Sequence, residues 1–486
     1  MIGLARLGGP VACLGLALLL LATSRRDRLA GLGFAVLGAC MIAAALAPHD
    51  YAQAVGGTFA ALAIAAFLAA CFRRVPWLLP LLALACIPVR LGALGHHQLL
   101  VPLYVVVLGA AMQLAWELAH GDLRPRELRA AAWPLALYVA WVGLSLGWTQ
   151  DAHEGAVELL AFYVPFTVLA LGVARLPWKR FGMWALYIEL TVMALVFAGV
   201  GFYQYETRNV FENPKVIYSN AYASFFRVNS VFWDPSVYGR FLVVAMIPSV
   251  LLVVRGRSLR IAAAATAALV ITWFGLLISF SQSSFAALGL AVVCVAFLAW
   301  RWRALLAVGL AVVVLGGLAA AQPTVRRSIQ HHTTSGLNSA SSGRYSLVAN
   351  GIRIAAAHPV LGVGVGGFKH AYAKRVLRLH GKKNLKTAAS HDTPVTVAAE
   401  TGIVGLGLMA WLLVASFADV IRTRRLVSYS AGFALAAILV HSLFYSDFFE
   451  DPTTWLLLGV VAFAAPAAPT PVSPPPAVEA REAVPA

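Results

Sequence analysis

Long apolar runs separated by short polar segments dominate the pattern along this chain. Two of these runs, Ile261–Phe280 and Ala304–Ala321, contain no charged residue. Each is close to the ~20 residues that a helix needs to cross a bilayer. We count about 12–15 runs of this kind. The pattern therefore predicts an all-α polytopic membrane protein with about 12–15 transmembrane helices.

The amino-acid composition supports this class. Of the 486 residues, 60% are hydrophobic and 12% are charged, whereas soluble domains carry about 25% charged residues. A soluble protein this apolar could not cover its surface with polar groups, so the soluble, fibrous and disordered classes are excluded. Residues 465–486 are rich in proline and alanine, and we expect them to form a disordered tail.

The basic residues follow a regular alternation along the chain. Every second short connection carries Arg or Lys, at Arg25, Arg26, Arg28; Arg73, Arg74; Arg124, Arg126, Arg129; Arg175, Lys179, Arg180; Arg255, Arg257, Arg260; Arg301, Arg303; and Arg422, Arg424, Arg425. The connections between them carry acids at Asp50, Asp151, Glu154, Asp447, Glu450 and Asp451, with Arg90 as the one clear basic exception. Short cytoplasmic loops are enriched in Lys and Arg, so the basic set is predicted to face the cytoplasm. Much of the net charge of +17 is thereby explained without nucleic acid as a partner.

Two connections are much longer, and the alternation places both on the outer face. The transmembrane helices are predicted in three groups, which are N-terminal (residues 1–204), central (237–321) and C-terminal (396–464). The two connections between these groups are a first extracytoplasmic loop (205–236) and a large basic extracytoplasmic loop (322–395). The tail is 465–486. The large loop has many Lys and Arg residues against a single acid, Asp392. Such a loop would attract an anionic substrate, and a phosphate group is the leading candidate. Alternatively, the loop lies on anionic lipid headgroups.

The large loop is expected to contain two short helices with a glycine-rich turn between them. Ser346–Ala357 and Lys369–Leu379 have apolar residues at helical spacing. Between them, Gly362, Gly364 and Gly367 formally satisfy G-x-G-x-x-G, but the βαβ unit that a dinucleotide site requires is missing. Glycines that allow a close backbone approach between the two helices explain the segment better.

Several residues at the predicted outer face are candidates for chemistry. Asp234 precedes a proline at a helix start, which is typical of an N-terminal cap. Arg227 lies at the membrane boundary among apolar residues, which favours a functional role. Arg240 lies about one turn inside the next helix, where it marks a site, forms an internal pair, or reaches toward the headgroups.

Three further segments contribute polar side chains to the same face. Ser279–Ser284, which contains Gln282, is a small polar turn between two spans. Its simplest role is to satisfy backbone hydrogen-bonding groups. Arg344 stands at the start of a loop helix, where a guanidinium and backbone donors can together hold phosphate. His391 lies where the chain re-enters the membrane. The pair His331–His332 has no partners at metal-ligand spacing, so we predict neither a metal nor a cofactor.

Taken in order, these fragments resemble the bacterial O-antigen ligase and O-antigen polymerase family. The resemblance rests on Arg227…Asp234-Pro235, the turn Ser279–Ser284, Ser342-Gly-Arg344 with His358-Pro-Val-Leu-Gly362, and His391…Glu400-Thr-Gly402. It implies a metal-independent membrane glycosyltransferase whose donor is a glycan on undecaprenyl pyrophosphate. It further implies that Arg227 and Arg344 hold the pyrophosphate and that His391 is essential. The chain departs from the family at Gln282, where Arg is common, and at Asp392, where Asn, Ser or Gln is usual.

The chemistry agrees with these residue types. A pyrophosphate leaving group needs its charge neutralised, for which paired arginines are suited. A neutral histidine near pH 7 can deprotonate an acceptor hydroxyl, and an adjacent Asp392 could orient its ring. The acceptor is a lipid, a glycan or a protein, so ligase and polymerase activities both remain open. The alternatives are a transporter or flippase of an anionic lipid-linked sugar, and a structural scaffold. The predicted location is the bacterial cytoplasmic (inner) membrane, with the active site on the extracytoplasmic side.

Overall fold

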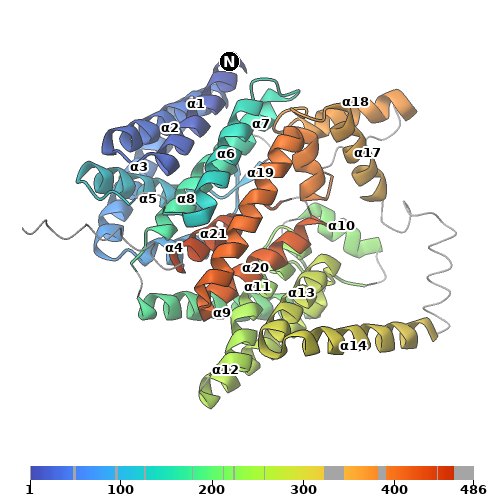
Figure 1. Cartoon of the computed structure of the whole chain (residues 1–486). Helices are drawn as coiled ribbons and strands as arrows, with labels where there is room; N and C mark the ends of the chain where they lie inside the picture. Colours follow the sequence, from blue (N-terminus) through green and yellow to red (C-terminus); the bar gives the residue numbers. More distant parts are fainter. Residues whose placement is uncertain are drawn as a thin grey trace, which may run out of the picture.

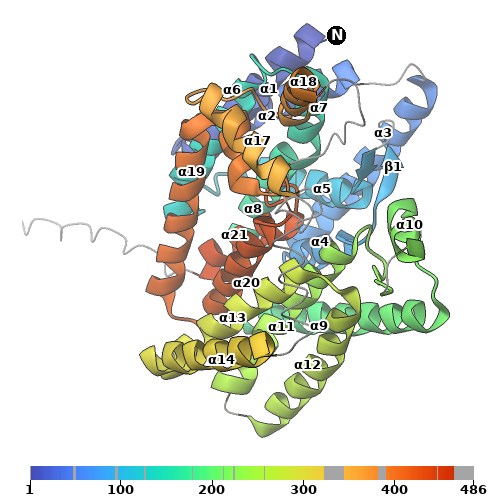
Figure 2. The ribbon, with the colours of Figure 1, turned by 90° about the vertical axis from the view of Figure 1, so that its right-hand side faces the viewer.

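The protein is described here by a computed structural model in which almost every element is a helix (Figures 1 and 2). The described residues are 2–46, 51–93, 97–124, 127–177, 179–211, 213–222, 225–256, 258–321, 344–380, 390–445 and 447–464. The predictions for His331–His332, for Ser341–Gly343 and for the tail fall outside these ranges.

The N-terminal half contains the elements up to the first long connection. They are α1 (Ile2–Leu21), α2 (Arg25–Leu46), α3 (Tyr51–Arg74), α4 (Leu78–Cys86), β1 (Leu91–Ala93), β2 (His97–Leu99), α5 (Val101–Ala119), the 3-10 turn η1 (Arg129–Ala131), α6 (Ala132–Ser145), α7 (Ala152–Glu158), the π-turn η2 (Leu159–Tyr163), α8 (Val164–Ala174) and α9 (Arg180–Thr207). The strands β1 and β2 form an antiparallel hairpin in which Gly92 faces Gln98. This hairpin is too short to change the all-α class.

The C-terminal half is entirely helical in its described part. Its elements are α10 (Pro214–Tyr222), α11 (Pro235–Arg255), α12 (Leu259–Ser279), α13 (Gln282–Trp300), α14 (Trp302–Ala321), α17 (Arg344–Ala357), α18 (Phe368–His380), α19 (Thr393–Thr423), α20 (Leu426–Ser442) and α21 (Pro452–Ala464). The two short helices expected in the large loop are confirmed as α17 and α18.

Ten helical segments within the described residues are long and apolar enough to cross a membrane, and α20 and α21 are shorter apolar helices. The prediction of an all-α polytopic membrane protein is therefore confirmed. Small residues allow close helix packing in this bundle. For example, a Cβ atom at Gly38 of α2 would lie only 2.3 Å from the Ala12 backbone nitrogen of α1.

Three of the basic connections meet at one end of the bundle. Glu127 accepts from Arg28 at 2.7 Å and from Arg175 at 2.5 Å, and Arg124 donates to the Arg175 carbonyl oxygen at 2.7 Å. Arg28 and Arg175 are both buried. Connections that the charge alternation assigns to one side of the membrane thus share a single ion-pair network.

The helices α17 and α18 pack where α19 begins, close to α7 (Figures 1 and 2). Backbone hydrogen bonds link the segment between α17 and α18 to this region. Gln150 donates from its N–H to the Val363 carbonyl oxygen at 3.0 Å, and Val363 donates to the Ala399 carbonyl oxygen at 2.9 Å. The segment between α17 and α18 is therefore held between the end of α6 and the first turns of α19.

Candidate active site

Arg227 lies on the extended segment between α10 and α11, and Asn220 holds its backbone. The Asn220 amide donates to the Arg227 carbonyl oxygen at 2.9 Å, while its own oxygen accepts from the Arg227 N–H at 3.0 Å. The guanidinium donates from Nε to the Ser279 carbonyl oxygen at 3.2 Å. Burial lowers the pKa of Arg227; Asp234 opposes this effect and Arg344 adds to it. No salt bridge among the described residues includes Arg227, so this half-buried cation keeps the capacity to bind an anion.

Arg344 is the exposed first residue of α17. Its positive charge lowers the pKa of Arg227 and also that of His391. Such effects require charges that lie close together. The charge of Arg344 is therefore felt at both Arg227 and His391, although the three residues come from separate segments of the chain.

His391 directly precedes α19 and has a left-handed backbone conformation with φ 58°. The edge of its half-buried ring meets Tyr445, and the two ring centroids are 6.2 Å apart. Burial lowers the pKa of His391 below its ordinary value; Arg344 adds to this effect, while Asp234 opposes it. The imidazole is therefore neutral at pH 7 and able to accept a proton.

The two aspartates next to these residues cap helices. Asp234 accepts from the Ser236 N–H at 2.7 Å at the start of α11, which confirms the expected cap. Asp392 accepts from the Val395 N–H at 2.9 Å at the start of α19. None of the described hydrogen bonds of Asp392 reaches His391. In this arrangement Asp392 orients the helix, whereas Asp234 acts on His391 through its charge.

Arg240 and Gln282 are not joined to Arg227, Arg344 and His391 by described contacts. Arg240 is 4% exposed and pairs with Asp447 at 2.5 Å and with Asp451 at 2.9 Å. It forms an internal pair, so the expectation that it reaches toward the headgroups is wrong, because two buried carboxylates hold its guanidinium. Gln282 is exposed at the first position of α13, directly after Ser281, whose side chain caps that helix. The serine side chains of this turn satisfy backbone groups, as the simpler interpretation predicted.

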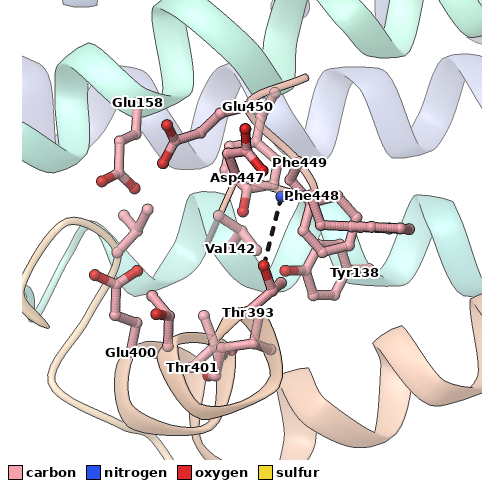
Figure 3. Close-up of a pocket in the computed structure, with 14 residues that line it drawn as sticks. Tyr138, Val142, Glu158, Thr393, Glu400, Thr401, Asp447, Phe448, Phe449 and Glu450 are labelled. Carbon is pink, nitrogen blue, oxygen red and sulfur yellow. Dashed lines mark hydrogen bonds between the residues drawn. The ribbon is translucent and has the colours of Figure 1, made fainter. Parts of the chain in front are cut away.

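An open cavity of about 260 Å³ lies beside His391. His391, Tyr445 and Lys369 line it together with carboxylates, which are Glu154, Glu158, Glu400, Asp447 and Glu450. A narrower cavity of about 50 Å³ shares Glu158, Glu400, Asp447 and Glu450 with it. Figure 3 shows the carboxyl groups of Glu158, Glu400 and Glu450 directed toward a common space. We call these two adjoining spaces the acidic cavity.

Glycines place Glu400 in the wall of the acidic cavity. Gly362, with φ 67°, approaches α19 so closely that a Cβ atom there would lie 2.2 Å from the Glu400 carbonyl oxygen. The Gly364 N–H donates to this same oxygen at 2.8 Å, and α19 is kinked at Gly402, where φ is 67° and ψ is −168°. The Phe368 N–H donates to the Glu400 carboxylate at 3.1 Å. The glycines therefore allow a close backbone approach to α19, whereas the sequence predicted such an approach between the two loop helices.

The electrostatics of the acidic cavity differ from those around Arg227. Burial and then Asp447 raise the pKa of Glu450 to about 7, although Lys369 opposes them. Lys369 pairs with Glu154. Burial, followed by Asp234 and Asp447, raises the pKa of Tyr445. The cavity wall is therefore rich in hydrogen-bonding groups that are partly protonated near neutral pH.

Sequence reasoning missed the acidic cavity. The charge pattern predicted only a basic chamber, and it assigned Glu450 and Asp447 to a short acidic loop. One available signal was Glu158, a carboxylate followed directly by a long apolar run, since ionisable residues within membrane spans usually mark a function. The remaining members come from separate helices and could not be grouped without the fold.

Comparison with known families gives a match over residues 267–410, to the family of O-antigen ligases. The matched region extends from α12 into α19 and contains Arg344, His391 and Glu400, whereas Arg227 and Asp234 precede it. A comparison with curated proteins found no match.

Proposed function

We propose that this protein, which matches the O-antigen ligase family over residues 267–410, transfers a glycan from an undecaprenyl-pyrophosphate carrier to an acceptor hydroxyl. The family indicates a glycosyltransferase-type enzyme that acts on lipid-linked glycans. The observation that supports the more specific proposal is that the charge of Arg344 acts on both Arg227 and His391, and that the pKa of His391 is lowered. This set combines a cation pair suited to a diphosphate with a base suited to a hydroxyl.

In the proposed reaction, the acceptor oxygen attacks the anomeric carbon of the donor sugar. The bond from that carbon to the diphosphate oxygen breaks, and its electron pair leaves with the carrier diphosphate. His391 takes the proton that the acceptor hydroxyl loses. Arg227 and Arg344 neutralise the charge that develops on the diphosphate, which is the larger electrostatic requirement of the step.

Metal independence is part of the proposal. Two guanidinium groups can bind a diphosphate through several parallel hydrogen bonds and supply the positive charge that a divalent cation would otherwise provide. Arg227 and Arg344 have no described carboxylate partner that would compete for them. We therefore expect turnover to persist when divalent cations are removed with a chelator.

The protein is a multi-pass membrane protein, and we propose that its site faces away from the cytoplasm of a bacterial inner membrane. The support is the charge alternation together with the single end at which Arg28, Arg124 and Arg175 meet. Cysteines placed at Arg303 and at Arg353 in a cysteine-free background should react with an impermeant label from opposite sides. Labelling of both from the same side would contradict the proposed orientation.

A flippase for an anionic lipid-linked sugar is the competing function. It would also use many spans and exposed cations, but it has no need of a neutral base beside the arginines. Deleting the protein in its host and analysing the glycans distinguishes the possibilities. A full-length polymer accumulating on the outer-leaflet carrier indicates a ligase, and single repeats there indicate a polymerase. Lipid-linked glycan confined to the inner leaflet would contradict the transferase.

A further inference from the structure

We infer that a groove between α13, α14, α19 and α20 binds an anionic phospholipid, whose acyl chains lie on apolar walls and whose phosphate lies at Arg301 and Arg424. The groove has a volume of about 660 Å³, within the ~300–1,000 Å³ that is typical of small-ligand sites. Its walls are mainly aliphatic and aromatic side chains, among them Phe297 and Leu298 of α13, Leu305 of α14, Ile421 of α19 and Phe433 of α20. We call it the α13–α20 groove.

The α13–α20 groove is remote from the candidate active site along both of the helices that they share. α13 begins shortly after Ser279, whose carbonyl oxygen accepts from Arg227, and ends just before Arg301. α19 begins shortly after His391 and ends just before Arg424. The proposed orientation places Arg301 and Arg424 on the cytoplasmic side. A lipid in this groove is therefore not the glycan carrier, whose diphosphate we propose to bind on the opposite side.

Two arginines give one end of the groove the charge that a phosphate requires. Arg301 and Arg424 both line the groove, and both side chains are exposed. In the part of the chain that the structure describes, neither forms a salt bridge. Arg255, from the connection between α11 and α12, donates to the Leu298 carbonyl oxygen at 3.5 Å and adds a third cation beside the same wall. Guanidinium groups bind phosphate oxygens through paired hydrogen bonds.

The apolar wall extends from these arginines over the depth of one acyl layer. On α13 the lining residues continue from Arg301 back to Val293, a distance of about 12 Å at 1.5 Å per helical residue. On α20 they reach Phe433, which lies a similar number of residues beyond Arg424. Half of a bilayer core is about 15 Å thick. A groove of this depth with a basic end fits a membrane amphiphile better than a free phosphate ion.

The charge at the arginines specifies which phospholipid fits. A zwitterionic phospholipid would cover the apolar walls equally well, but its headgroup carries a positive charge that offsets its phosphate. An anionic headgroup brings a net negative charge to Arg301 and Arg424. Basic pockets between transmembrane helices on the cytoplasmic side bind anionic headgroups for this reason. We therefore expect selection by headgroup charge, with the acyl chains supplying binding that is common to both lipid classes.

The first test measures headgroup selection. Full-length protein is delipidated in detergent and titrated with dioleoyl phosphatidylglycerol or dioleoyl phosphatidylcholine, and the first bound lipid is quantified by native mass spectrometry. Phosphatidylglycerol should bind about tenfold more tightly. The double variant Arg301→Gln with Arg424→Gln should lose about tenfold in affinity for phosphatidylglycerol, while its affinity for phosphatidylcholine should stay within about twofold, because the apolar walls are unchanged. Arg25→Gln with Arg26→Gln, at exposed arginines of another basic connection, is the matched control and should change neither affinity.

Three results of this titration would overturn the inference. They are equal affinities of the wild type for the two lipids, a loss in the control variant as large as that in the Arg301 and Arg424 variant, and preferential binding of undecaprenyl phosphate over phosphatidylglycerol. The second would reduce the effect to net surface charge, and the third would make a polyprenyl lipid the occupant.

The second test locates the acyl chains. Phosphatidylglycerol with a diazirine in one acyl chain is bound to the protein and irradiated, and the crosslinked peptides are mapped. Adducts should concentrate on α13 and α20 and should decrease in the Arg301→Gln, Arg424→Gln variant. Adducts spread evenly over all spans would overturn the inference. Neither test uses glycan transfer, so a failure of the proposed function and a failure of this inference are separate results.

Discussion

Two regions next to His391 differ in the ionisable side chains that they contain. In one region, the positive charge of Arg344 acts on both Arg227 and His391, and neither arginine has a described carboxylate partner. In the other, the acidic cavity presents Glu158, Glu400 and Glu450. The arginines are available to bind an anion, whereas several carboxyl groups of the cavity are engaged, because Asp447 pairs with Arg240 and Glu154 pairs with Lys369.

A second contrast separates structural from functional arginines. Arg240 and Arg227 lie close in the sequence, and both are removed from bulk water. Arg240 is held by Asp447 and Asp451, whereas the one described hydrogen bond of the Arg227 guanidinium goes to the backbone oxygen of Ser279. A neutralised guanidinium stabilises the fold, while one without a counter-ion remains available for a substrate anion.

The largest effect is expected from removing the base. His391→Ala should lower single-turnover transfer by ~10²–10⁴-fold, because general-base assistance contributes a factor of this size. Donor binding should persist, since the arginines hold the diphosphate. His391→Gln keeps some hydrogen bonding but cannot take the proton, so it should be almost as slow. Weak donor binding combined with normal turnover at saturation would assign His391 to the phosphate side instead.

Arg240→Gln should affect the fold more than the chemistry. It leaves Asp447 and Asp451 as buried carboxylates without their cation, which typically costs about 3–5 kcal/mol. The expected readout is a large drop in the unfolding midpoint in detergent. Equal stability of the variant and the wild type would show that the pair contributes nothing to the fold.

Arg227→Lys and Arg344→Lys keep the charge but remove the planar pair of donors. We expect each to lose roughly 10–100-fold in donor kcat/KM with folding preserved, because a lysine cannot reproduce bidentate phosphate contacts. Arg353→Lys, on the exposed face of α17, is the control. Wild-type turnover in both site variants would reduce these arginines to structural residues.

The smallest effect is a displacement of the pH profile. The neutral form of His391 is the active base, so activity falls as pH drops through its pKa. Arg344 lowers this pKa and Asp234 raises it. Arg344→Gln should therefore move the acid limb of kcat/KM to higher pH. Asp234→Asn, which retains a capping side chain, should move it to lower pH. Shifts in the same direction would contradict the arrangement of charges around His391.

The sequence predicted those features that depend on neighbouring residues, and it did not predict contacts between distant segments. The spans and the helices α17 and α18 follow from apolar spacing within short windows. Arg227, Arg344 and His391 were found through motifs, but their convergence required the fold. The partners of Arg240 lie about 200 residues away. Glu400 lies two residues before the kink of α19 at Gly402, and no local pattern in the sequence predicted this kink.

Transfer in a reconstituted system tests the central claim most directly. The protein is placed in liposomes with an undecaprenyl-pyrophosphate-linked glycan and the acceptor extract, in the presence of a chelator, and free undecaprenyl pyrophosphate is quantified by mass spectrometry. The account predicts release of the carrier pyrophosphate in step with acceptor glycosylation, dependent on acceptor and abolished in His391→Ala. Movement of the intact lipid-linked glycan between leaflets without any release of carrier pyrophosphate would contradict it.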